Sequence, residues 1–309
     1  MKLKEVKCIW WDGYHNAFTD IIKYKGNYFV CFRHATEHGL KGQGEIYVLR
    51  SSDLENWKLI KKFPPLKDSR DPKFFIFEEK IGVLFFAYPD INTTKIRDGY
   101  ISYSDDGENF SPVINISKDN LCFWRIRNYK EKLYATAYKT GEKEEDWGSY
   151  LFFSEDGENF NKVSIILDGE YANETDLLFE RDICYAIVRR ENLQTPALCI
   201  SKYPFVEWES YNLNKIIQAP CIFKFKGEIY IAGRVYNPLP KTGISKLDIE
   251  RKRVKDEIIL PSGGDTSYCG VAVENDKLYL SYYSQHEIED KESKVGKNAA
   301  GIYIAEIGE

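Results

Sequence analysis

Residues 174–190 read ETDLLFERDICYAIVRR and are typical of a β-hairpin. A short strand, Thr175–Phe179, is followed by a charged turn and a second strand, Ile183–Val188. The second strand of a hairpin ends beside the start of the first strand. Glu174 and the two arginines that end the stretch should therefore share one rim of a sheet. A carboxylate and two guanidinium groups on one rim suit the binding of a charged or polar ligand.

The same hairpin pattern recurs along the chain. Its six copies occupy residues 17–33, 72–88, 123–138, 174–190, 220–234 and 268–283. Their turns lie 45 to 54 residues apart, a period that indicates the blades of a β-propeller. In each of the first four units a third strand follows the hairpin. This strand ends in a turn that is rich in Ser and Asp and is followed by an aromatic residue. These turns are Ser51–Trp57, Ser104–Phe110, Ser154–Phe160 and the less regular Ser201–Trp208. We expect them on the opposite rim, as scaffold.

A fourth, outer strand follows in five units. These strands are predicted at 58–63, 111–116, 161–167, 209–213 and 254–260. The sixth unit lacks one, and the N-terminal run Leu3–Trp10 has no hairpin of its own, so we expect it to complete the last blade and close the ring. The prediction is an all-β, six-bladed propeller of four-stranded antiparallel blades, with residues 1–309 as a single domain.

Composition narrows the possible functions. The 309 residues carry a net charge of −5, which gives no case for binding nucleic acid or a membrane surface. No apolar run is long enough to span a membrane, and the charged N-terminus does not resemble a signal peptide, so a cytoplasmic location is expected. The seven cysteines show no CxxC spacing and are interpreted as buried, reduced thiols. We expect no cofactor and no metal; the oligomeric state is left open.

The rim that carries Glu174 should collect the start of each first strand and the loop after each second strand. Read around the ring, it offers these candidate ligand contacts: His15, Arg33, His34, Arg70, Asp71, Trp124, Arg125, Arg189, Gln218, Arg234, Asp265, Tyr283 and His286. All four histidines of the chain fall there, which favours a substrate-contact or acid–base role for at least one of them. Arginines beside carboxylates and tyrosines suit a sugar, especially one that carries a carboxylate. The structural alternative is a set of rim salt bridges without a ligand.

These features together resemble the sialidase (neuraminidase, BNR-repeat) superfamily over nearly the whole chain. The Ser-Asp-Gly-aromatic turns resemble its Asp-boxes, and Glu174, Arg189, Arg234 and Tyr268 match four of its active-site residues in blade and order. The resemblance implies that Tyr268 is a nucleophile, Glu174 its base, and the two arginines a substrate clamp. A neutral tyrosine that attacks beside a carboxylate avoids repulsion from an anionic substrate.

Two positions depart from the family pattern. His15 stands where the first arginine of the clamp belongs, and the loop of the acid–base aspartate holds Glu37 and His38 instead. We therefore expect a retaining glycoside hydrolase of the sialidase type, acting on a possibly acidic saccharide, with Glu37 or His38 as proton donor.

Three alternatives stay open. A polysaccharide lyase would use His and Tyr as base and acid. An arabinanase- or phosphorylase-type glycosidase would use Asp20, Asp71 and Glu174, since Arg70-Asp71-Pro72 resembles a motif of those five-bladed families. A propeller that binds carbohydrate without cleaving it would use the same rim.

Overall fold

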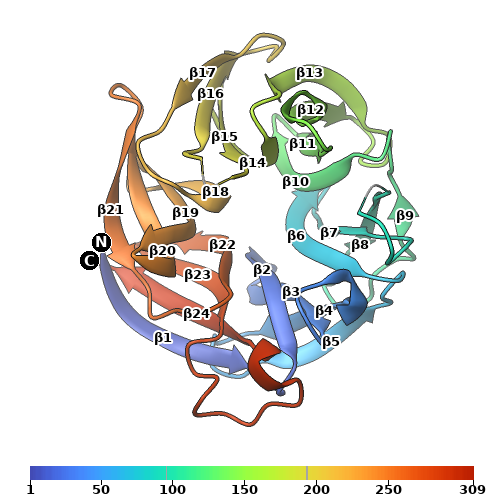
Figure 1. Ribbon diagram of the computed structural model, residues 1–309, viewed down its shortest axis with the longest axis vertical. Coiled ribbons are helices and arrows are strands. Elements are labelled where there is room, and N and C mark those ends of the chain that lie inside the picture. The colour runs from blue at the N-terminus through green and yellow to red at the C-terminus, as the bar shows by residue number, and fades with distance from the viewer. Residues whose placement is uncertain (95, 193) are drawn as a thin grey trace.

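Strands arranged in six sheets make up the fold. The computed structural model describes residues 1–94, 96–192 and 194–309, and within these residues 24 strands form six four-stranded antiparallel sheets. The sheets stand around a ring, with β2, β6, β10, β14, β18 and β22 nearest its centre (Figure 1). The predicted six-bladed propeller with four-stranded antiparallel blades is confirmed.

In five of the six blades, the four strands follow one another in chain order from the centre outward. Five blades are built from uninterrupted chain: β2 (His15–Tyr24), β3 (Asn27–Ala35), β4 (Glu45–Ser51) and β5 (Lys58–Phe63); β6 (Ser69–Phe77), β7 (Lys80–Ala87), β8 (Asp98–Ser104) and β9 (Ile114–Asn115); β10 (Cys122–Tyr129), β11 (Lys132–Lys139), β12 (Gly148–Ser154) and β13 (Asn161–Asp168); β14 (Ala172–Glu180), β15 (Ile183–Arg190), β16 (Ala197–Lys202) and β17 (Glu209–Asn212); β18 (Gln218–Phe225), β19 (Glu228–Asn237), β20 (Leu239–Asp248) and β21 (Arg253–Ile259). The connections contain 3₁₀ helices at Leu40–Gly42, Glu144–Asp146 and Gly296–Asn298.

The sixth blade joins the two ends of the chain. It contains β22 (Thr266–Glu274), β23 (Lys277–Ser284), β24 (Gly301–Gly308) and β1 (Lys2–Trp10). β1 pairs antiparallel with β24, from Lys2 opposite Gly308 to Trp10 opposite Ile302. The predicted closure of the ring by the N-terminal strand is therefore correct, and the pairing covers an edge of β24 that would otherwise face solvent.

Two differences between the predicted and observed strand boundaries affect the description of the rim and of the second blade. β14 begins at Ala172, so Glu174 lies inside the strand, and Arg189 and Arg190 lie inside β15. The outer strand predicted at 111–116 forms ladder pairs only at Ile114 and Asn115. Pro112 has no N–H to give to the ladder.

The inner strand of every blade contains a β-bulge at the same level. The antiparallel register shifts within β2, β6, β10, β14, β18 and β22, each time a few residues after the strand starts. The bulges contain Phe18, Asp71, Trp124, Glu174, Ala219 and Tyr268. A bulge leaves a residue unpaired and redirects its side chain. Six equivalent bulges thus aim six side chains at the start of the central channel.

Proline and positive φ mark several of these bulges. Asp71 and Ala219 each precede a proline, and their φ angles are +51° and +50°. Tyr268 has a φ of +53°. Proline is tolerated here because a bulge needs no ladder hydrogen bond at that position. Non-glycine residues at positive φ are uncommon and cluster at functional sites.

Further along the channel, charged side chains replace an apolar core. Arg125 lies between two aspartates, 2.8 Å from Asp20 Oδ2 and 3.6 Å from Asp176 Oδ1. Asp176 also pairs with Arg127 at 2.6 Å. These groups border a cavity of about 290 Å³ that Phe179 and Lys224 also line. Because these residues follow the bulges along their strands, the cavity lies beyond the bulge level, away from the rim.

The Ser-Asp turns are held by their own side chains. In the second blade, Ser104 Oγ donates to Asp106 Oδ1 at 2.9 Å, and Asp106 Oδ1 accepts from the backbone N–H of Asn109 at 2.8 Å. The same bonds recur at Ser154 and Asp156. Within the described residues, no helix is long and apolar enough to cross a membrane.

Candidate functional site

Tyr268, Glu174 and Arg189 form a compact group at the channel start. The phenol of Tyr268 donates to Glu174 Oε1 at 2.7 Å. Arg189 Nη1 lies 2.8 Å from the same carboxylate oxygen and 3.3 Å from the phenolic oxygen. Its Nη2 pairs with Glu191 at 2.9 Å, which fixes the guanidinium. The structure thus brings together three residues that are 94 or fewer positions apart in sequence but lie in blades four and six.

The phenol of Tyr268 is held in its neutral form. Burial raises its pKa well above the usual value, and the negative charge of Glu174 adds to the rise although Arg189 opposes it. Tyr268 can therefore act as a nucleophile only if its proton leaves as it attacks, and the acceptor in contact is Glu174. Arg189 is placed to stabilise negative charge that develops on the phenolic oxygen.

Several buried polar atoms around this group lack a hydrogen-bond partner within the described residues. They are Asp71 Oδ1, Glu174 Oε2, Trp124 Nε1 and Arg189 Nε. Two are acceptors and two are donors. A buried polar group without a partner costs about 1–3 kcal/mol. Four such groups in adjoining blades two, three and four suggest a place built for a polar ligand.

Asp71 occupies the same bulge position in blade two as Glu174 in blade four and Tyr268 in blade six. Burial raises its pKa to about 6; Lys73 opposes this rise and the charge of Glu174 adds to it. Its Oδ1 atom has no hydrogen-bond partner within the described residues. Asp71 is therefore a carboxyl group that can hold a proton near neutral pH and release it.

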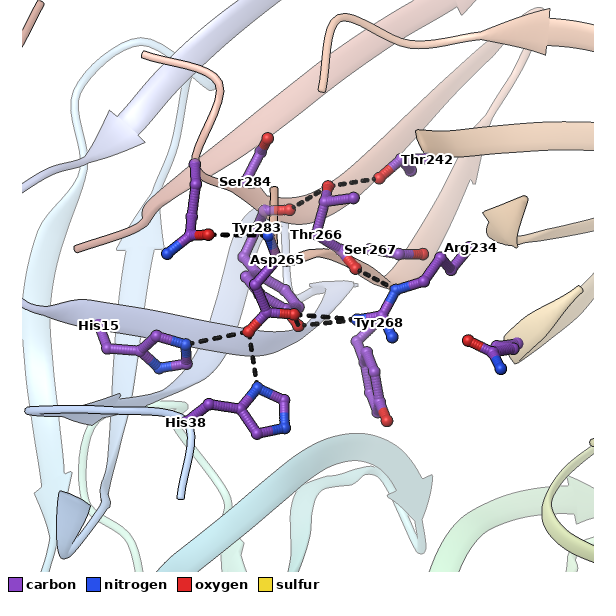
Figure 2. A network of polar contacts seen from close by, with 12 residues as sticks. His15, His38, Arg234, Thr242, Asp265, Thr266, Ser267, Tyr268, Tyr283 and Ser284 are labelled. Atoms are coloured by element: carbon purple, nitrogen blue, oxygen red, sulfur yellow. Dashed lines mark hydrogen bonds and ion pairs between the residues drawn. The ribbon is translucent and has the colours of Figure 1, made fainter. Parts of the chain in front are cut away.

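A second network centres on Asp265, between two histidines and Arg234 (Figure 2). Asp265 Oδ2 lies 2.6 Å from His38 Nδ1 and 3.1 Å from His15 Nε2. Its other oxygen accepts from Tyr283 at 2.6 Å and from Arg234 Nη2 at 3.0 Å. Burial alone would raise the pKa of Asp265, but the two histidines and Arg234 hold the pKa well below its usual range.

His15, His38 and Asp265 could also hold a metal ion. One ligand atom from each lies within 4.8 Å of the others. The Arg234 guanidinium, however, already supplies positive charge 3.0 Å from the same carboxylate. Burial lowers the pKa of His15, so its neutral ring can donate a hydrogen bond to Asp265. This polar network accounts for the geometry without a cation.

Arg33 and Arg70 meet on one carboxylate that sequence reasoning did not single out. Asp68 is fully buried and accepts from Arg33 Nη2 at 2.7 Å and from Arg70 Nε at 2.5 Å. Arg33 Nη1 also donates to the carbonyl of Glu37, and Arg70 Nη2 donates to the carbonyl of His38. The two arginines therefore hold the loop after β3, which positions His38.

Aromatic rings fill the space between these polar groups. Phe18 lies 4.8 Å from Tyr268 and 5.2 Å from His38, measured between ring centroids. Trp124 lies 5.7 Å from Tyr268 on the other side. Arg234 places its guanidinium 5.6 Å from the Tyr268 ring. Aromatic faces beside polar groups suit the apolar and hydroxyl-bearing faces of a sugar ring.

Four other predicted ligand contacts are held by residues outside the groups described above. His34 stacks on Tyr47 and pairs with Asp12. His286 bonds to Ser284 and packs on Tyr303. Arg125 belongs to the ion pairs further along the channel, and Gln218 accepts from Tyr236.

Two further residues of the expected catalytic schemes join neither network. Glu37, expected as a proton donor of the hydrolase, is held only through its backbone carbonyl, which accepts from Arg33 Nη1. Asp20 is tied to Arg125 and to the backbone N–H of Phe74, so it does not join Asp71 and Glu174 as a free carboxylate.

Sequence reasoning also missed Arg97. Arg97 lies in the long connection before β8, and no repeat position predicts it.

No family model and no curated protein matches this chain. Solved structures do match. A protein of unknown function from Dyadobacter fermentans is 16% identical, with a TM-score of 0.80 and 99% of both chains covered.

Two further similar structures are sialidases. A Hadza microbial sialidase, Hz136, is 14% identical with a TM-score of 0.72; 95% of this chain covers 66% of that one. A Trypanosoma rangeli sialidase in complex with the inhibitor DANA is 11% identical with a TM-score of 0.69; 95% of this chain covers 55% of that one. The chain thus has the six-bladed propeller fold found in sialidases, and spans about two thirds or less of those sialidase chains. The predicted resemblance holds at the level of the fold.

Proposed function

We propose that the chain is a retaining glycoside hydrolase that cleaves a saccharide at the rim containing Glu174. The contact between Tyr268 and Glu174, 2.7 Å long and bridged by Arg189, carries the proposal. The unpartnered polar atoms of Asp71, Trp124 and Glu174 support it, because a polyhydroxylated ligand can supply their missing hydrogen bonds.

In the first step, the Tyr268 oxygen attacks the anomeric carbon while its proton passes to Glu174 Oε1. The bond from the anomeric carbon to the leaving oxygen breaks, and that oxygen takes a proton. The product is a glycosyl–tyrosine intermediate and a free alcohol. Arg189 stabilises the phenolic oxygen as it gains charge.

In the second step, water replaces tyrosine at the anomeric carbon. The group that gave its proton to the leaving oxygen takes one from the water, and Glu174 returns its proton to the Tyr268 oxygen. Every group regains its starting state, and retention follows from two displacements at one carbon.

We assign the proton donor to Asp71 rather than to Glu37 or His38. Asp71 shares the bulge level with Glu174 and Tyr268, and burial raises its pKa to about 6, so part of the population carries a proton near neutral pH. His38 is bonded through Nδ1 to Asp265, which suits a role in placing the substrate. Glu37 lies on the loop that Arg33 holds by its carbonyl.

A polysaccharide lyase is the second candidate, and the His38–Asp265 contact favours it. A carboxylate bonded to Nδ1 leaves Nε2 as a base that could remove a proton beside a uronate carboxyl group. The two reactions give different products. Hydrolysis releases a new reducing end, whereas a lyase releases an unsaturated sugar that absorbs in the near ultraviolet.

The test is product analysis with a panel of neutral and acidic oligosaccharides, for the wild type and for Glu174→Gln and Tyr268→Phe. We expect reducing ends from the wild type, and loss of at least about a thousandfold in kcat from each variant. Gln218→Asn, which changes a buried rim residue outside both networks, serves as the matched control. Full turnover by both variants contradicts the catalytic assignment. Binding without any product supports a carbohydrate-binding propeller instead.

A further inference from the structure

Arg97 is a buried cation that no carboxylate neutralises within the described residues. Among the described residues, six arginines are buried: Arg33, Arg70, Arg97, Arg125, Arg189 and Arg190. Five of them pair with an aspartate or glutamate. Arg97, only 7% exposed, does not.

Neutral groups hold the Arg97 side chain in place. Its guanidinium carbon lies 5.7 Å from the ring centroids of both Tyr88 and Tyr138. Nη2 donates to Thr140 Oγ1 at 2.6 Å, and Nε lies 3.4 Å from the Tyr88 hydroxyl. The two rings attract the guanidinium by cation–π interaction. Neutral partners offset only in part the free-energy cost of removing a guanidinium from water without a counter-charge.

The Arg97 group adjoins the candidate active site. Tyr138 lies 6.3 Å from Trp124, which lies 5.7 Å from Tyr268. On the other side, the Tyr88 ring also receives the guanidinium of Arg70, the residue before Asp71. Trp124 adds an unpartnered buried indole N–H to this side of the rim. A cation and a free donor thus lie between blades two and three, opposite Arg234 in blade five.

We propose that Arg97, Tyr88 and Tyr138 form a subsite for an oxyanion, a carboxylate or sulfate, on the saccharide. This inference rests on the proposed function, because it takes the ligand to be a sugar bound beside Glu174. Arg189 and Arg234 already pair with Glu191 and Asp265, so their charges are largely neutralised. Arg97 is the buried guanidinium with its charge still available, and its planar fork matches an oxyanion.

The melting temperature of an Arg97→Gln variant distinguishes a ligand-binding role of Arg97 from a purely structural role. If Arg97 only braces blades two and three, Arg97→Gln should lower the melting temperature as much as Arg190→Gln, which breaks the ion pair between buried Arg190 and half-exposed Glu170. If Arg97 instead binds an oxyanion of the ligand, its charge is unpaired in the free protein, and Arg97→Gln should leave the melting temperature of the free protein unchanged or raise it. Arg190→Gln should lower it by several degrees. Equal losses for the two variants overturn the proposal.

Binding supplies the second readout. Tryptophan fluorescence of the full chain is titrated with glucose, glucuronate and glucose 6-sulfate, for the wild type, Arg97→Gln and Arg97→Lys. We expect the wild type to bind at least one charged sugar about tenfold more tightly than glucose, and Arg97→Gln to lose that preference. Arg97→Lys should keep part of it. A wild type without preference, or a preference that survives Arg97→Gln, overturns the proposal.

These titrations need no turnover, so the two proposals can fail separately. If the protein cleaves a saccharide in a reaction that depends on Glu174 but shows no preference for charged sugars, only the oxyanion-subsite proposal is contradicted. If it prefers charged sugars through Arg97 but cleaves no saccharide, the subsite proposal is supported and the hydrolase proposal is contradicted.

Discussion

Asp71 is a buried acidic side chain whose ionised form lowers the stability of the folded protein. Its carboxyl group is 7% exposed, and burial raises the pKa to about 6, above about 3.9 for an unfolded chain. The folded protein therefore favours the protonated form. The stability from this group is fully present below pH about 4 and is lost as the pH rises through about 6.

Asp71→Asn should remove this pH dependence. At pH 7.5 the variant should be more stable than the wild type by about 1–3 kcal/mol, because the buried charge is gone, and at pH 4 the two should be similar. Urea unfolding at both pH values measures this, with the exposed Asp290→Asn as control. A variant that is less stable than the wild type at pH 7.5 contradicts a raised pKa of Asp71.

The same substitution bears on catalysis. If Asp71 donates the proton, the wild-type kcat/KM should fall as the pH rises above about 6, since the donor is lost. In Asp71→Asn, kcat/KM should no longer fall as the pH rises above about 6, and kcat should be lower by about a hundredfold or more. If kcat/KM of the variant still falls at alkaline pH, the proton donor is another residue, and His38 is the next one to test.

At the scale of the element, the bulge in each inner strand determines which side chains reach the site. The bulge of β22 depends on the close approach of β2. A Cβ added at Gly270 would lie 2.3 Å from Asp20 Oδ1 and 2.3 Å from the backbone nitrogen of Ile21. Backbone cannot yield as a flexible side chain does, so β22 must have glycine there.

Gly270→Ala should therefore move β22, with Tyr268 two residues earlier on it. We expect a loss of about 1–3 kcal/mol in the free energy of unfolding, from overpacking, together with a lower kcat. Denaturant unfolding and turnover measure the two effects. Gly39→Ala, where the nearest atoms to an added Cβ lie at 3.7 Å in the Glu37 side chain, is the matched control. Wild-type stability in Gly270→Ala would show that the two strands can separate at no cost.

For the whole molecule, closure of the ring matters most. β1 covers β24 and fixes the ends of the chain side by side (Figure 1). Removal of residues 2–10 should lower the melting temperature and promote self-association, because the bared edge of β24 can pair with another chain. Thermal unfolding and size-exclusion chromatography check this, with a Lys2→Ser, Lys4→Ser variant that keeps the strand as control. A truncated protein that stays monomeric and equally stable would mean that closure adds nothing.

Periodicity in the sequence was enough to predict the blades, their order and the closing strand. Alternating apolar residues and polar turns are local signals, and they repeat about every 50 residues. The contact between Tyr268 and Glu174, which occupy equivalent places in two blades, was implied by the resemblance to sialidases. Positions that share a place in the repeat share a level in the ring, so sequence position alone predicts their rim.

Only the tertiary structure could decide which rim residues meet. Asp68 beneath Arg33 and Arg70, and Asp265 between two histidines and Arg234, depend on the distances between blades and on side-chain directions at the bulges. His34 and Arg125 have equally suitable sequence positions, yet each is directed to a carboxylate elsewhere. Arg97 comes from a connection outside the repeat. Charge pairing depends on separations of a few ångströms in space, and a repeat pattern specifies the level of a residue in the ring but not its neighbours.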